Sequence, residues 1–264
     1  MLCQIPDSVS KLFLHTGNML YYTDVTKQVN MATTEQIVEG LKTCLSCEKL
    51  PDQEDDSLRL RRSILINQTD EDKKNLQTMV KVFVPTTDLN YLHEALEYTL
   101  SDLELPCIDS VILSCQVKED DSDTLLDDLL LMWKILEELV NKGQITSIGI
   151  SDVSTETFVN LYKAVEVKPS INQINLTACC VVPQDLQEFC KEHDIRILTH
   201  NDPVDILPVD ILKPLFRVEN DQNEDDETKS ISSMKVAWVT RFQAHIKCRG
   251  ILSNKGYIVC LHLK

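Results

Sequence analysis

Three short apolar segments at a regular spacing constrain the fold of this chain more than any other feature. They begin at Ile145, Ile171 and Ile195, which lie 26 and 24 residues apart. Each interval holds apolar residues at helical spacing, so the order is strand, helix, strand. Consecutive strands joined by a helix of this length run parallel in one sheet. The region 108–199 therefore predicts an α/β fold with a parallel sheet.

The ends of several elements are also marked in the sequence. Apolar residues at i, i+3 and i+4 predict a helix over 123–141, and Gly143 after it can adopt a positive φ. Ser154 can cap the next helix, and Pro183 suits the start of the one that follows. Outside this region we expect a helix over 34–47, strands within 13–20 and 79–84, a charged loop over 51–74, and core-forming segments at 236–246 and 250–259.

The length of the chain favours a closed barrel over an open sheet. Eight strand–helix units of 33 residues would account for 264 residues, and α/β barrels of about 250 residues form one domain. No G-x-G-x-x-G follows a predicted strand, which argues against an open dinucleotide-binding sheet. We expect a (β/α)8 TIM-type barrel over 1–264, with room for an incomplete C-terminal end and with an acidic loop or insertion at about 219–229.

A large excess of acidic residues excludes some classes of partner. The chain has 42 Asp and Glu against 26 Lys and Arg, a formal net charge of −16. Such a surface repels nucleic acid, and the longest apolar runs are far shorter than the roughly 20 residues that span a bilayer. The N-terminus lacks a secretory pattern, so we expect a cytoplasmic protein with reduced cysteines.

Three phrases in the regular region resemble the fourth to sixth strands of the aldo-keto reductase barrel. They are ELVNKGQI at 138–145, IGISD at 148–152 and KPSINQI at 168–174. The resemblance implies a TIM-type barrel of the aldo-keto reductase kind. It also implies a catalytic set of tyrosine, lysine, aspartate and histidine for nicotinamide chemistry.

Most of that catalytic set is missing here. None of the six tyrosines has an aspartate five positions before it, and Ser114 stands where the family's histidine ends its strand. Only Lys81 matches the family's lysine, which leaves it a vestigial catalytic candidate. A lysine inside an apolar strand is expected to be paired, because an unpaired buried charge is costly.

The positions that hold the cofactor in the aldo-keto reductases are only partly kept. Ser151 and Gln173 match family positions that bind the nicotinamide amide, and they are the residual cofactor-binding candidates. Asp152 replaces the neighbouring asparagine, and the phosphate-binding segment is reduced to the residues at 253–255. We therefore expect no cofactor, with residual NADPH binding as the alternative.

A second set of phrases runs along the chain and resembles the modifier, or regulatory, subunits of glutamate–cysteine ligase. These are LHTGN at 14–18, VKP at 167–169, NQINL at 172–176, CCVVP at 179–183, LTHNDP at 198–203 and RGILSNKGYI at 249–258. The resemblance implies a non-catalytic barrel that forms a heterodimer with the ligase catalytic subunit. In that family the association improves glutamate use and relieves feedback inhibition by glutathione.

The candidate partner contacts follow two predicted strands at the carboxyl end of the barrel, where functional loops gather. They are Cys179, Cys180, His200, Asn201 and Asp202. Plain packing of the cysteines and a turn beginning at Asn201 are the alternatives.

Other cysteines suggest no metal centre. Cys44 and Cys47 have the spacing of half a zinc site, but no second pair lies at a suitable distance, so we expect no metal site.

Three functions remain open from the sequence. The first is a regulatory subunit of glutamate–cysteine ligase. The second is an NADPH-dependent oxidoreductase that uses Lys81 with a substitute acid. The third is a thiol-based redox sensor, which would need a cysteine of depressed pKa.

Overall fold

The computed structural model describes residues 3–6, 8–21, 31–46, 52–54, 56–61, 75–115, 122–177, 181–218 and 234–263. The chain divides into two compact units. Unit 1 comprises Met1–Leu76 and Asp205–Lys264, and unit 2 comprises Gln77–Val204. The acidic run expected at about 219–229, as well as Cys47, Cys179 and Cys180, lies outside the described residues. The single barrel over 1–264 stays a prediction.

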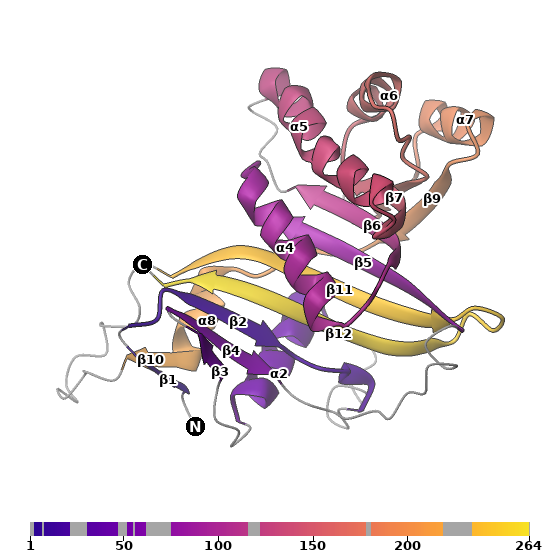
Figure 1. Ribbon diagram of the computed structural model, residues 1–264. Coiled ribbons are helices and arrows are strands. Elements are labelled where there is room, and N and C mark those ends of the chain that lie inside the picture. The colour runs from indigo at the N-terminus through magenta and orange to yellow at the C-terminus, as the bar shows by residue number, and fades with distance from the viewer. Residues whose placement is uncertain are drawn as a thin grey trace. The chain divides into compact units, whose positions relative to one another are not determined.

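Unit 2 is a regular alternation of parallel strands and helices (Figure 1). Its strands are hydrogen-bonded in the order β5, β6, β7, β8, β9, which is also their order along the chain. The helices α4 to α7 pack each against the next. The elements are β5 (Leu76–Val84), α4 (Leu89–Asp102), β6 (Ile108–Cys115), α5 (Ser122–Asn141), β7 (Ile145–Ser151), α6 (Thr155–Ala164), β8 (Ile171–Asn175), α7 (Gln184–Glu192) and β9 (Arg196–His200).

The helix and strand signals of this region are confirmed to within a few residues. Ser154 caps α6, and its hydroxyl accepts the N–H of Thr157 at 3.1 Å. Gly143, two residues after the end of α5, has a φ of 72°. The helix α5 buries Leu129, Met132, Trp133 and Leu136 completely, at the spacing that predicted an amphipathic helix.

Unit 1 has a different architecture, built on long antiparallel strands. Five of its strands are hydrogen-bonded in the order β3, β4, β2, β12, β11. The strands β11 and β12 form an antiparallel hairpin, and β12 also pairs antiparallel with β2. The elements are β1 (Cys3–Ile5), β2 (Lys11–His15), η1 (Met19–Tyr21), α2 (Thr33–Leu45), β3 (Asp52–Glu54), β4 (Ser57–Arg61), α8 (Val209–Leu212), η3 (Lys213–Leu215), β10 (Phe216–Val218), β11 (Lys235–Ile246) and β12 (Leu252–His262).

Two expectations need correction in unit 1. The eight-unit repeat predicts only parallel neighbours, whereas the hairpin of β11 and β12 is antiparallel. The segment 51–74 is not simply a loop, because β4 pairs in parallel with β2 and places Leu58 in the core at 1% exposure. The two errors have different physical causes. The strand β4 pairs with β2, a partner distant in sequence, so its local pattern is weak. The strands β11 and β12 form a local hairpin, which the repeat argument did not consider.

Candidate functional site

The parallel register of unit 2 brings polar side chains from three strands to one edge of the sheet. Ser151 ends β7 and pairs in register with Gln173 on β8, and His200 ends β9 opposite Asn175. The carboxyl ends of parallel strands meet at the same edge, where the sites of α/β proteins form. Lys81 on β5 reaches the same group through its long side chain.

Lys81 is buried, at 2% exposure, and paired. Its ammonium donates hydrogen bonds to Asp202 Oδ2 at 3.1 Å and to Ser151 Oγ at 3.0 Å. A second carboxylate oxygen, Oδ2 of Asp152, lies 4.0 Å from Lys81 Nζ. This geometry agrees with the paired lysine that the sequence predicts. A buried ammonium that faces two carboxylates is held in its charged form.

His200 lies between the same two carboxylates. Its Nε2 is 2.8 Å from Asp152 Oδ1 and its Nδ1 is 3.1 Å from Asp202 Oδ2, while its side chain is only 5% exposed. Burial by itself lowers the pKa of His200, but hydrogen bonds with Asp152 and Asp202 outweigh burial and raise the pKa above its usual value. The imidazolium form is therefore favoured.

Asp152 completes this group, in an unusual backbone conformation. Its φ is 63°, in the left-handed region, and its N–H donates to Gln173 O at 3.0 Å. Burial alone raises the pKa of Asp152, but hydrogen bonds from His200 and Ser151 and the charge of Lys81 prevail and lower it. Lys81, Ser151, Asp152, His200 and Asp202 form one connected group, which we call the charge cluster.

The charge cluster joins residues that the sequence singled out for separate reasons. Lys81 was a catalytic candidate, Ser151 a cofactor candidate, and His200 and Asp202 candidate partner contacts. Asn201, the third contact candidate in this loop, is exposed. Sequence reasoning noticed Asp152 only as a departure from an asparagine. Asp152 carries a carboxylate where the family has an asparagine amide. This replacement was the signal in the sequence that Lys81 and His200 would have a new partner.

The hydrogen bonds that Ser151 makes in this structure do not leave it suited to bind a nicotinamide amide. A serine hydroxyl has one proton and two lone pairs. Ser151 Oγ donates to Asp152 Oδ2 at 2.7 Å, accepts from Lys81 at 3.0 Å and lies 3.2 Å from His200 Nε2. Its one proton is committed to Asp152 and cannot be donated to an amide carbonyl, although Gln173 Oε1 is buried and has no hydrogen-bond partner within the described part of the chain.

The segment that would bind a cofactor phosphate, in unit 1, is also engaged within that unit. Asn18 Nδ2 donates to Ser253 O at 3.1 Å, and Asn18 Oδ1 accepts the N–H of Lys255 at 3.2 Å. The ammonium of Lys255 donates to Gln36 Oε1 at 2.7 Å. A phosphate would have to compete with these bonds for the one basic side chain of the segment.

Thiol chemistry finds no support at the buried cysteine of α7. Burial raises the pKa of the Cys190 thiol to about 11, so the reactive thiolate is rare at neutral pH. Cys44 is also buried, and its Sγ lies 3.5 Å from His15 O.

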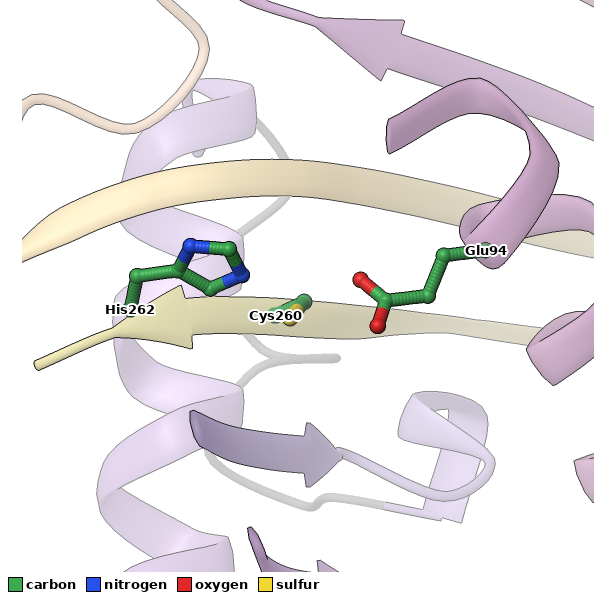
Figure 2. A group of neighbouring side chains, drawn as sticks. All are labelled: Glu94, Cys260 and His262. Atoms are coloured by element: carbon green, nitrogen blue, oxygen red, sulfur yellow. The ribbon is translucent and has the colours of Figure 1, made fainter. Parts of the chain in front are cut away.

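Cysteine and histidine, two residue types that bind metals, lie two positions apart on β12. Figure 2 draws Cys260 and His262 on this strand, together with Glu94 of α4. The β12 residues belong to unit 1 and Glu94 to unit 2, and we assign no metal site to them. The expectation of no metal site stays a prediction. Among the described residues, no helix combines the length and the apolar character needed to cross a bilayer.

Comparison with known proteins identifies one family and, within it, one kind of regulatory subunit. The sequence model of the aldo/keto reductase family matches residues 64–244. The chain is 31% identical over 258 residues to the glutamate–cysteine ligase regulatory subunit of Rattus norvegicus, a match that covers 95% of this chain and 92% of that protein. It is 30% identical over 256 residues to that of Homo sapiens, covering 94% and 91%.

A solved structure overlaps the chain more weakly. An aldo-keto reductase of Bombyx mori, crystallised with NADP, is 21% identical over 47% of this chain and 40% of its own, with a TM-score of 0.37. A TM-score this low supports no inference about function.

Proposed function

This chain belongs to the aldo/keto reductase family and, within it, to the regulatory subunits of glutamate–cysteine ligase, and on that premise we propose that it binds and regulates the catalytic subunit of this ligase. One observation carries the proposal: the match to these subunits runs along nearly the whole chain and nearly the whole relative. The aldo/keto reductase family model, by contrast, matches only residues 64–244.

The missing general acid supports a non-catalytic role. A reductase needs a lysine whose positive charge lowers the pKa of a neighbouring tyrosine, so that the tyrosine can act as the general acid. Here Lys81 donates hydrogen bonds to Asp202 and Ser151, but the family's lysine is held by an aspartate as well. What this chain lacks is the tyrosine, since none of its six tyrosines has an aspartate five positions before it. We infer that the chain is no reductase.

Regulation requires only that this chain binds one state of its partner more tightly than another. If it favours the state with higher glutamate affinity and weaker glutathione binding, the population shifts toward that state. Both effects then follow from one binding event, and no group of this chain has to enter the ligase active site.

The loops at the carboxyl end of the unit 2 sheet are the proposed contact face. They expose Leu176, Val181 and Val204, which are 43%, 71% and 81% accessible. Exposed apolar side chains that form a patch are typical of interaction sites. In the sequence Cys179 and Cys180 come between the first two of these residues, and Asn201 comes three positions before the third. In this proposal His200 and Asp202 support the face from below, since Asp202 is only 2% exposed.

The proposal is tested by titrating the purified chain into the catalytic subunit. We expect the apparent KM for glutamate to fall and inhibition by glutathione to weaken, both saturating at one chain per catalytic subunit. Neither parameter changing across the titration would refute the proposal. In a parallel assay with aldehydes, NADPH oxidation that Lys81→Met abolishes would favour the oxidoreductase alternative.

Paired variants test the contact face. Val181→Ser together with Val204→Ser removes two exposed apolar side chains and should weaken the complex by about tenfold or more. Leu131→Ser is the matched control, because Leu131 is also exposed, at 46%, but lies on α5. Equal affinities for both variants would place the interface elsewhere while leaving the regulatory role intact.

A further inference from the structure

We propose that His200 is a switch operated by protonation. Its ring nitrogen Nδ1 exchanges between two hydrogen-bond partners on Asp202 and thereby changes the hydrogen bonds of the loop after β9. The switch concerns the isolated chain and does not depend on the proposed function. It stands on one geometrical fact: a single ring nitrogen faces a donor and an acceptor of the same residue.

The two contacts of Nδ1 exclude each other. Nδ1 lies 3.0 Å from the backbone nitrogen of Asp202 and 3.1 Å from its Oδ2. In neutral imidazole with the proton on Nε2, Nδ1 accepts the Asp202 N–H. In the imidazolium ion, Nδ1 carries a proton and can only donate, so it bonds the carboxylate and the Asp202 N–H loses this acceptor.

The charges around His200 decide when the exchange occurs. The charged groups that face it within unit 2 are Asp152 from the end of β7, Asp202 from its own loop and Lys81 from β5. Ser151 and Asn175 are the neutral neighbours in the network. With neutral His200, two carboxylates face one ammonium, a net charge of −1. With imidazolium the charges balance, so the two carboxylates favour keeping the proton against the opposing effect of burial.

The exchange reaches the loop through Asp202 alone. Asn175 Nδ2 donates to Asp202 O at 2.8 Å in either state, which anchors one side of the residue. The N–H and the carboxylate of Asp202 change their relation to His200 when the imidazole loses its proton, while Lys81 keeps its hydrogen bond to the carboxylate. The residues carried by this loop are Asn201, Pro203 and Val204, all of them exposed.

Nuclear magnetic resonance of the full chain tests the switch. We expect the ring nitrogens of His200 to titrate with a midpoint above the ordinary value of about 6.5. The backbone amide of Asp202 should shift with the same midpoint, because its acceptor appears only when His200 is neutral. A midpoint at or below that ordinary value, or an Asp202 amide that ignores the titration, would overturn the proposal.

A conservative variant separates the switch from a general pH response. Asp152→Asn removes the carboxylate at Nε2 without changing side-chain size, and asparagine tolerates the left-handed φ of this position. The His200 midpoint should fall by about one pH unit or more. Glu138→Gln, the same charge change at an exposed position on α5, should leave the midpoint unchanged. Equal midpoints in the two variants would contradict the role of Asp152, and the wild-type titration decides the proposal even if Asp152→Asn fails to fold.

Discussion

The two units of this protein are stabilised by contacts of very different range. In unit 2 each strand pairs with the next strand along the chain, across a single intervening helix. In unit 1 the central pairing joins β2 to β12, and Phe13 lies opposite Cys260. The first kind of architecture follows from local periodicity, whereas the second requires segments from both ends of the chain to meet.

The interiors of the units differ in the same way. Unit 2 buries a balanced group of charges, which is stable only while every member keeps its partner. Unit 1 has close backbone packing: a Cβ on Gly256 would lie 2.2 Å from Gly17 O and 2.4 Å from Phe242 Cζ. Unit 2 has such an approach too, since a Cβ on Gly149 would lie 2.6 Å from Ile171 O, and its charge cluster adds a sensitivity to the loss of a charge.

The two tryptophans make this comparison measurable. Trp133 on α5 lies in unit 2 and Trp238 on β11 lies in unit 1, and both are fully buried. Trp238→Phe leaves a fluorescence probe in unit 2 alone, and Trp133→Phe leaves one in unit 1 alone. Denaturation of the two single-tryptophan chains reports on each unit separately.

The largest effect is expected from breaking the charge cluster. Asp202→Ala leaves Lys81 and His200 without their shared carboxylate, and removing one member of a buried ion pair costs about 3 kcal/mol or more. Urea denaturation followed by Trp133 should show this loss. Glu188→Ala, at an exposed position on α7, should change stability by less than about 0.5 kcal/mol. Similar losses in both variants would mean that the cluster contributes no special stability.

A smaller effect is expected from adding one methyl group in unit 1. Gly256→Ala forces β12 away from Gly17 and Phe242, and overpacking of this kind costs about 2 kcal/mol. Trp238 should report the loss. Gly143→Ala in unit 2 meets no atom within 4 Å and has only the strain of its φ of 72°, so it should cost about 1 kcal/mol. An equal cost at both positions would show that the close approach at Gly256 relaxes freely.

The smallest effect is a pH dependence confined to the charge cluster. The lowered pKa of Asp152 adds stability that is present above the usual aspartate pKa of 3.8 and is lost as pH falls through the folded value. The raised pKa of His200 adds stability that is present below the usual histidine pKa of 6.5 and is lost as pH rises through its folded value. Both contributions are complete between these limits.

Denaturation of Asp152→Asn at two pH values measures that window. The variant should lose more stability relative to wild type at about pH 5.5 than at a pH well above the His200 midpoint, where the imidazole is neutral in either chain. Because Asp152 is one-third exposed, screening keeps the difference below the two effects above. Glu138→Gln should show no such difference between the two pH values, and a larger loss at high pH would reverse the assigned sign.

The sequence alone predicted unit 2 well because the signals there are local. Helical spacing in α5, the cap at Ser154 and the regular strand starts at Ile145, Ile171 and Ile195 each depend on neighbouring residues. The same approach treated 51–74 as a loop and expected only parallel neighbours in the last segments. The strand β4 is defined by its pairing with β2, and a partner distant in sequence leaves no local pattern. The antiparallel direction of β11 and β12 was missed because the parallel repeat was extended to the last segments.

For the candidate site, too, local sequence and tertiary structure determined different features. The sequence determined which chemistry is present: a lysine in an apolar strand, a serine and a glutamine at cofactor positions, and an aspartate in place of an asparagine. Only the tertiary structure decided that Lys81, Ser151, Asp152, His200 and Asp202 close into one balanced group. The physical reason is that hydrogen bonds and ion pairs act over about 3 Å, and only the register of the parallel strands brings residues so distant in sequence within that reach.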